Sequence, residues 1–288
     1  MARRAPFRER TARRLAILQG RTLRTVQRSR PRYFSVFMHM PKCGGTSLSE
    51  AMYATVPFDH RVGVIDAVST RRASAMMTYA DDDALITHED FENGQSTFDF
   101  REGLLLQHMA WDTMLIHGHL FWSERADRMF GERYKYVTLL RDPVARAISN
   151  MRMCQREGIV SSSIDTYLES PVARRHTRVY LRYLSGRNDI PEEDVPKALD
   201  LASERLSRFD LVGFLDDLPG FSRNYHALFG VRLRLSKLNV APEKTTSLTD
   251  EQIDRIHALC APDIALYEQA LGLWSRDCKG PGCKDAAT

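Results

Sequence analysis

The feature that most constrains the fold is a short apolar run that leads into a glycine-rich turn and then into a helical pattern. Residues 33–40 predict a buried strand that stops at Pro41, and residues 47–53 have apolar side chains at helical spacing. The turn at residues 42–47 therefore lies at the N-terminus of a helix. Backbone N–H groups at such a position can bind an anion.

The same order of elements recurs along the chain. Residues 113–116, 134–140 and 210–214 are expected to form strands, and helices are expected over 143 to about 155, 172–183, 221–229 and after 249 and 262. Strands that alternate with helices predict an α/β fold with a mainly parallel sheet. We expect a P-loop-like three-layer sandwich in which helices flank the central sheet.

Charge is distributed unevenly along the 288 residues. Residues 1–32 hold eleven arginines against the single acid Glu9, which leaves 30 basic and 36 acidic residues elsewhere. We divide the chain into a basic N-terminal arm (1–32), one domain (33–275) and a tail (276–288). A solvated basic helix or a frayed terminus is the expected state of the arm, with contact to phosphates of lipid headgroups or nucleic acid as the alternative.

Cysteine spacing and hydropathy indicate a cytoplasmic location. The five cysteines have no paired C-x-x-C spacing, which favours free thiols in a reducing compartment over a disulfide framework or a structural zinc site. No apolar run is long enough for a signal-peptide core or a membrane span. Peripheral contact with a membrane through the basic arm remains open.

The glycine-rich turn has the composition of an anion cradle. Its glycines allow close backbone approach, while an ammonium and hydroxyls supply further donors. The lysine precedes the glycines, whereas it follows them in the G-x-x-x-x-G-K-[ST] motif, so an ordinary ATP-hydrolysing loop is disfavoured. The candidate binding residues of the turn are Lys42, Cys43, Gly44, Gly45, Thr46 and Ser47.

A second phosphate-type motif follows the strand at 134–140. Arg141 ends that strand, and Ser149 lies eight residues later, about two turns into the following helix. A guanidinium and a hydroxyl so placed can hold one phosphate from two sides. The alternatives are pairing of Arg141 with Asp142 and back-bonding of Ser149 within its helix. Arg146 is expected to be an exposed or structural charge.

These two motifs together resemble those of the sulfotransferases that use 3′-phosphoadenosine 5′-phosphosulfate, especially the branch that contains heparan sulfate 2-O-sulfotransferase. The turn at 41–47 resembles that family's 5′-phosphosulfate loop, and residues 141–149 resemble its 3′-phosphate motif. Weaker similarity extends the match to residues 177–186, 211–214, Asn239 and 263–268. The resemblance covers roughly residues 33–274.

The resemblance implies a catalytic role for the sequence His117-Gly118-His119. It assigns the general base to His119, with His117 beside it, and implies that Lys42 stabilises charge on the leaving phosphate. Imidazole suits this role because its unperturbed pKa of about 6.5 lies near neutral pH. From the residues alone, two histidines at a strand end are more often structural or metal-linked, and no third ligand has a suitable spacing.

The implied donor is 3′-phosphoadenosine 5′-phosphosulfate, the product is adenosine 3′,5′-bisphosphate, and no metal is required. For adenine or the rim of the 3′-phosphate the resemblance suggests Arg178, Tyr183 and Gly186, although an ordinary helix end with a glycine cap is an equal interpretation. Asn239 and Lys244 are candidates for a loop that closes over the cofactor.

The acceptor is expected to be a glycan, a glycolipid or a small hydroxyl compound. Cys43 stands where the family often has threonine or serine, and the membrane anchor of secretory family members is absent from this sequence, which favours a bacterial-type cytosolic enzyme. The residues considered for the acceptor cleft, or as hints of an anionic acceptor, are Trp111, His108, Arg152, Arg156, Arg71, Arg72, Arg174 and Arg175.

Two other functions compete with this interpretation. A nucleotide-dependent phosphotransferase would share the cradle and would need a magnesium-binding acid, for which Asp216 and Asp217 are candidates. A non-enzymatic protein that binds membranes or nucleic acid through its basic arm is the third possibility, and it predicts a steep salt dependence that resides in residues 1–32. No specific nucleic-acid partner is expected for the enzyme.

Overall fold

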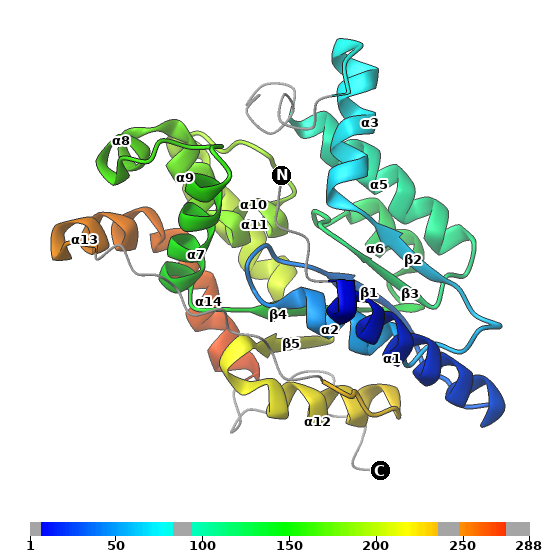
Figure 1. Ribbon diagram of the computed structural model, residues 1–288. Coiled ribbons are helices and arrows are strands. Elements are labelled where there is room, and N and C mark those ends of the chain that lie inside the picture. The colour runs from blue at the N-terminus through cyan, green and yellow to red at the C-terminus, as the bar shows by residue number, and fades with distance from the viewer. Residues whose placement is uncertain (1–6, 83–93, 236–247, 275–288) are drawn as a thin grey trace.

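A computed structural model describes residues 7–82, 94–235 and 248–274. Within these ranges a five-stranded sheet has the order β2-β3-β1-β4-β5, and every neighbouring pair is parallel (Figure 1). The strands are β1 (Phe34–Met38), β2 (Val62–Ile65), β3 (Leu115–Gly118), β4 (Tyr134–Leu140) and β5 (Leu211–Phe214). Since all strands run the same way, their carboxyl ends meet at one edge of the sheet, which is where open α/β sheets bind ligands.

The helices connect and flank these strands. They are α1 (Phe7–Val26), α2 (Gly45–Tyr53), α3 (Ala67–Tyr79), α5 (Gln95–Ala110), α6 (Glu124–Phe130), α7 (Pro143–Arg156), α8 (Ile164–Glu169), α9 (Pro171–Thr177), α10 (Val179–Ser185), α11 (Val195–Ser207), α12 (Leu218–Phe229), α13 (Asp250–Leu259) and α14 (Ala261–Trp274), with short 3₁₀ turns at Glu192–Asp194 and Leu215–Asp217.

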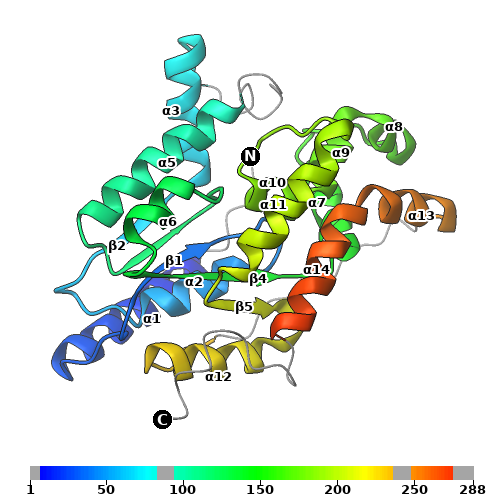
Figure 2. The same cartoon turned by 180° about the vertical axis from the view of Figure 1, so that it is seen from behind.

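Helices cover both faces of the sheet, which gives three layers (Figures 1 and 2). Along β1, Phe37 packs into a cluster with α2 and α12, while Val36 and Met38 pack into a second cluster with α5, α10, α11 and α14. A strand buried on both faces needs apolar side chains at successive positions, which explains the continuous apolar run in the sequence. The predicted three-layer α/β fold is confirmed.

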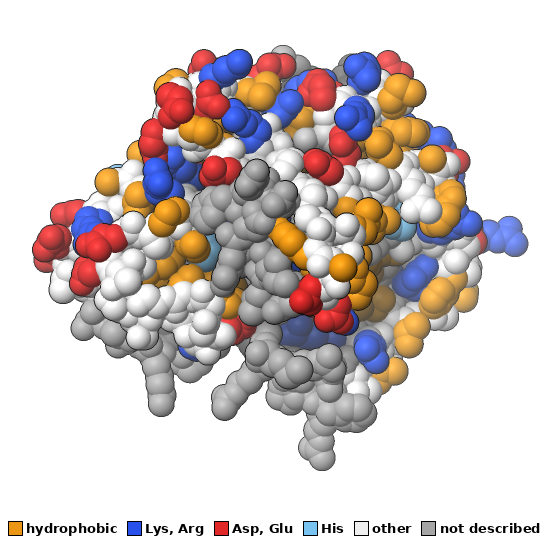
Figure 3. Space-filling view, turned by 90° about the horizontal axis from the view of Figure 1, so that it is seen from above, with side chains coloured by type: hydrophobic (Ala, Val, Ile, Leu, Met, Phe, Trp, Pro, Cys, Tyr) orange, Lys and Arg blue, Asp and Glu red, His pale blue; other side chains and the backbone are white. Residues whose placement is uncertain are grey.

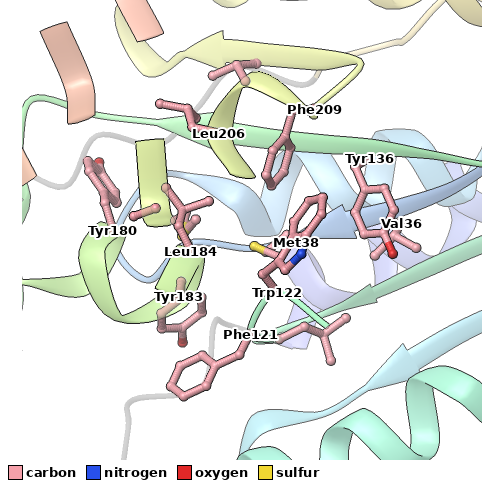
Figure 4. Packing of buried hydrophobic residues seen from close by; sticks show 14 of the residues in the cluster. Val36, Met38, Phe121, Trp122, Tyr136, Tyr180, Tyr183, Leu184, Leu206 and Phe209 are labelled. Carbon is pink, nitrogen blue, oxygen red and sulfur yellow. The ribbon is translucent and has the colours of Figure 1, made fainter. Parts of the chain in front are cut away.

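An aromatic group anchors α10 to the sheet. Figure 4 shows Trp122 near Met38, Tyr136 and Phe209, and its ring centroid lies 4.9 Å from that of Tyr136 and 5.6 Å from that of Phe209. The backbone N–H of Trp122 donates to the carbonyl of Tyr183 on α10 (2.8 Å). Helix α10 is therefore fixed against the centre of the sheet.

The helix predicted over 172–183 is in fact two helices, α9 and α10, with a break at Arg178. The cause lies far away in the sequence. The carboxylate of Asp263 accepts hydrogen bonds from the backbone N–H groups of Tyr180 (2.8 Å) and Leu181 (2.9 Å), and so caps a new helix at this point.

Arg146 is fully buried, so its interpretation as an exposed charge is wrong and the structural one holds. Its guanidinium donates to the carbonyls of His176 (2.7 Å) and Thr177 (3.3 Å) and lies 3.9 Å from Asp263. Arg146 thus ties α7 to the end of α9.

The arm contains an ordered helix. Arg21 on α1 donates to the carbonyls of Val56 (3.0 Å) and His60 (3.0 Å), and Gly20 allows close approach because a Cβ there would lie 2.6 Å from the Cβ of Ala54. Helix α1 is therefore docked against α2 and the loop after it, and is not frayed. None of the helices in the described part of the chain combines the length and apolar character that crossing a bilayer requires.

Candidate functional site

The glycine-rich turn connects β1 to α2 at the carboxyl edge of the sheet. Its backbone turns through two left-handed residues, Lys42 (φ 66°) and Gly44 (φ 75°). Gly44 is the N-cap of α2 and provides no side-chain cap, so the first N–H groups of the helix are left for a ligand. This arrangement fits an anion cradle.

Cationic side chains surround the turn. Burial, followed by repulsion from Arg156 and to a smaller degree from Arg141, lowers the pKa of Lys42. The Lys42 ammonium lies 3.5 Å from the sulfur of Met153, near the end of α7. A bound anion would relieve the repulsion among these cations, which is a second reason to place a negatively charged group here.

The thiol of Cys43 is buried beneath the turn, 3.3 Å from the hydroxyl of Tyr180. Burial raises the pKa of Cys43 to about 11. The thiol is therefore neutral at physiological pH and is not a nucleophile. The contribution of Cys43 to the cradle is its backbone.

The second motif lies beside the first because β4 is the neighbour of β1. The guanidinium of Arg141 reaches the carbonyl of Lys42 (3.5 Å). Asp142 caps α7 through the N–H of Ala145 (2.7 Å), as its position predicts, and so does not hold Arg141. Ser149 is half-buried on α7, and within the described residues no hydrogen bond joins it to Arg141 or to the turn.

Tyr180 fastens the two motifs together, a role that the sequence interpretation missed. Its hydroxyl donates to the carbonyl of Arg141 (2.6 Å) and accepts from the N–H of Arg141 (2.9 Å), while it also contacts the Cys43 sulfur. Tyr180 is fully buried on α10. One phenol therefore sets the distance between the glycine-rich turn and Arg141.

Three histidine rings are stacked next to the turn. Strands β1 and β3 pair with Phe37 opposite His117 and Met38 opposite Gly118, so the residue after β1, His39, lies beside His119. The ring centroids of His39 and His119 are 4.5 Å apart, and those of His39 and His117 are 5.2 Å apart. His39 was not identified from the sequence, and only the pairing of β1 with β3 reveals it.

The hydrogen bonds of His119 define its tautomer. Nδ1 lies 2.8 Å from the carbonyl oxygen of His39, and because a carbonyl only accepts, Nδ1 carries the proton. The neutral ring therefore has a lone pair on Nε2. Burial, with smaller effects from His39 and Arg101, lowers the pKa of His119 well below 6.5, so this lone pair is available at neutral pH.

The other two histidines link His119 to the turn. Nδ1 of His117 lies 2.6 Å from the Tyr53 hydroxyl, and its Nε2 lies 3.1 Å from Nδ1 of His39. The His39 ring also reaches Gly45, where an added Cβ would lie 2.2 Å from Nε2 of His39. Burial lowers the pKa of His39 to about 4 and that of His117 to about 3, so both rings are neutral.

Two arginines complete this side of the site. Arg101 is buried and donates to the carbonyls of His119 (3.0 Å) and Ala67 (3.1 Å), which holds α3 against the end of β3. Arg71 on α3 lies close enough to lower the pKa of His119. Its neighbour Arg72 instead forms an exposed pair with Asp82.

Several other candidates lie elsewhere. Arg178 pairs with Glu192 (3.0 Å), Gly186 (φ 74°) ends α10, and Tyr183 packs its ring 5.1 Å from that of Phe121 in the core. These positions favour the structural interpretation of the segment. Asn239 and Lys244 lie outside the described residues.

Two of the residues considered for the acceptor cleft are separated from the turn, whereas Arg156 lies close enough to lower the pKa of Lys42. Trp111 and His108 lie before β3, at the opposite edge from His119, where the N–H of Thr113 donates to the His108 carbonyl (3.0 Å). Asp217 caps α12 by accepting from the N–H of Gly220 (3.0 Å), which is sufficient reason for an acid at that position.

Comparisons with known proteins give little further information. No family model and no curated protein matches the chain. A solved chain described with the PezAT chromosomal toxin-antitoxin system of Streptococcus pneumoniae aligns over 90% of this chain and 97% of its own length, at 12% identity and a TM-score of 0.33. No inference is drawn from so weak a superposition.

Proposed function

We propose that this protein transfers a sulfuryl group from 3′-phosphoadenosine 5′-phosphosulfate to a hydroxyl of a carbohydrate-type acceptor. The observation that carries the proposal is the neutral His119, whose Nδ1 is held by the His39 carbonyl and whose Nε2 remains a proton acceptor. The same histidine stack reaches Gly45 in the anion cradle. A base and a cradle joined in this way suit the transfer of an anionic group to a hydroxyl.

Each part of the site has a role in this proposal. When bound, the donor supplies a sulfuryl group, and its bond between sulfur and the phosphate oxygen breaks during transfer. The N–H groups at the start of α2 and the ammonium of Lys42 bind the 5′-phosphosulfate and stabilise charge on the departing phosphate. In this proposal Arg141 and Ser149 hold the 3′-phosphate. Nε2 of His119 takes the proton of the acceptor hydroxyl as its oxygen attacks sulfur.

We infer a cytoplasmic enzyme that acts on a glycan, a glycolipid or a small hydroxyl compound. Helix α1 exposes Leu15 and Val26, whose side chains are 52% and 76% accessible, among the arginines of the arm. That combination supports peripheral contact with an anionic membrane, which sedimentation with vesicles of anionic lipid would detect and which deletion of residues 1–32 should abolish.

The donor can be identified by calorimetric titration. Adenosine 3′,5′-bisphosphate, ADP and ATP are compared without added magnesium. The proposal expects saturable binding of the bisphosphate and much weaker binding of the other two. Preference for ATP would instead support a phosphotransferase.

The base can be tested by measuring sulfuryl transfer in His119→Ala. A general base contributes about 10²-fold or more, so turnover should fall by at least that factor while bisphosphate affinity is retained. His108→Ala is the matched control, since that ring lies at the opposite edge of the sheet. Full activity in His119→Ala would exclude the assignment.

Lys42 should behave differently from a simple binding residue. Lys42→Ala is expected to lower turnover by a larger factor than it weakens binding of the spent bisphosphate, because the charge that it stabilises develops during transfer. Turnover equal to that of the wild type would remove Lys42 from the mechanism.

A further inference from the structure

A second cationic pocket lies away from the glycine-rich turn, between α9, α10 and the segment before the 3₁₀ turn at Glu192–Asp194. Its cavity volume is about 320 Å³. Four arginines line it, and we call it the four-arginine pocket: Arg174, Arg175, Arg178 and Arg182. The turn at 42–47, Arg141 and Ser149 contribute nothing to its lining.

Arg182 is half-buried beside the buried Arg175, and its hydrogen-bond partners are all neutral. Its guanidinium donates to the backbone carbonyl and the side-chain oxygen of Asn188 (both 2.6 Å) and to the carbonyl of Arg175 (3.2 Å). Burial, followed by repulsion from Arg175, lowers the pKa of Arg182 to about 9. Attraction to the carboxylates of Asp263 and Asp189 opposes this shift only in part, and neighbouring buried guanidiniums are costly unless anions offset their charge.

The rim of the pocket already binds a carboxylate. Glu192 pairs with Arg174 (3.2 Å) and Arg178 (3.0 Å), while its own side chain is 54% accessible. The Nε of Arg178 is buried and has no hydrogen-bond partner among the described residues. The residues that line the pocket include these four arginines and one acid, Asp189.

We propose that the four-arginine pocket binds a small ligand through a phosphate or sulfate group. Planar guanidinium forks match the oxygens of these anions, and several forks converging on one cavity favour a tetrahedral dianion over a single carboxylate. The cavity volume lies at the lower end of the range for small-molecule sites. Figure 3 shows basic and acidic side chains interspersed on one face of the molecule.

The probes are inorganic phosphate and inorganic sulfate, titrated separately into the full chain by calorimetry at pH 8 and constant ionic strength in chloride. Saturable binding of either anion is expected, and the tighter of the two identifies the group that the pocket prefers. Arg178→Gln should weaken binding by about tenfold or more, as expected for loss of a hydrogen bond to a charged group.

Glu192→Gln provides the sharper test because it should strengthen binding. It frees Arg174 and Arg178 from their carboxylate, so we expect a gain of about three- to tenfold in affinity. Glu193→Gln changes the same charge at the adjacent exposed position and should leave affinity unchanged. Both positions are on the surface, so folding of the variants is not at risk.

Three results would overturn the inference: no saturable binding of either anion, equal affinities in Glu192→Gln and Glu193→Gln, or binding lost in Lys42→Ala but retained in Arg178→Gln. The last result would place the anion at the glycine-rich turn. The inference is independent of the sulfuryl donor, because failure to bind adenosine 3′,5′-bisphosphate would leave the phosphate and sulfate titrations unaffected.

Discussion

Replacing Tyr180 with phenylalanine isolates the contact that joins the two phosphate-type motifs. The substitution keeps the buried ring and removes only the hydroxyl, which makes a 2.6 Å and a 2.9 Å hydrogen bond to the backbone of Arg141. Each such bond contributes about 1 kcal/mol net, and a backbone group left without a partner costs about 1–3 kcal/mol. We expect the free energy of unfolding to fall by about 2 kcal/mol.

The same change should weaken ligand binding. Arg141 is held beside the turn by Tyr180, and its guanidinium contacts the Lys42 carbonyl. With its backbone released, Arg141 should lose about one charged hydrogen bond to the 3′-phosphate. The dissociation constant of adenosine 3′,5′-bisphosphate should therefore rise roughly tenfold. Urea denaturation measures the first effect, and calorimetric titration measures the second.

Tyr134→Phe is the matched control for this experiment. Tyr134 is also fully buried, and its hydroxyl donates to the carbonyl of Thr113 (3.1 Å), at the opposite edge of the sheet from the turn. It should lose stability without a change in affinity. If Tyr180→Phe lost stability but bound the bisphosphate as tightly as Tyr134→Phe, Tyr180 would not position Arg141.

Two further predictions concern the histidines and the glycines. Unfolded histidine takes up a proton near pH 6.5, whereas folded His39 stays neutral to about pH 4, so its contribution to unfolding free energy should decline as the pH falls from 6.5 to 4. Asp263, whose pKa is raised to about 6, acts in the opposite direction in this range. The quantity to measure is therefore the difference in unfolding free energy between wild type and His39→Gln, from urea melts at each pH. A pH-independent difference would exclude the effect. Gly45→Ala should reduce both stability and bisphosphate affinity because its Cβ would enter the His39 ring. Gly103→Ala in α5, where a Cβ meets nothing within 4 Å, should be neutral or stabilising by about 0.5–1 kcal/mol. Equal melting temperatures for the two variants would contradict this prediction.

Much of the local order of strands, turns and helices could be predicted because it depends on short-range patterns, although strand β2 was missed. Strand β4 occupies residues 134–140 as expected, and Asp142 with Pro143 begins α7. The break at Arg178 could not be predicted, because the capping carboxylate of Asp263 lies more than eighty residues away in the sequence. Arg178 and Tyr183 consequently occupy positions different from those of a single helix.

The candidate site also combines features that the sequence predicts with features that only the tertiary structure reveals. The cradle is a local feature, since its glycines and lysine lie within one turn that joins β1 to α2. His39 was missed because its significance depends on a neighbouring strand, and its sequence neighbours contain no motif that indicates a histidine cluster. Tyr180 was missed for a similar reason, because its partners belong to two other segments.

The sequence by itself therefore determined the class of fold and the positions of two candidate anion-binding motifs, because apolar periodicity, glycine and proline act over a few residues. Only the tertiary structure decided which side chains meet. Parallel pairing of β1 with β3 creates the histidine stack, and burial of its rings lowers their pKa values. Packing of α10 against the sheet brings Tyr180 to Arg141, since contacts between distant segments depend on how whole elements pack and not on local preference.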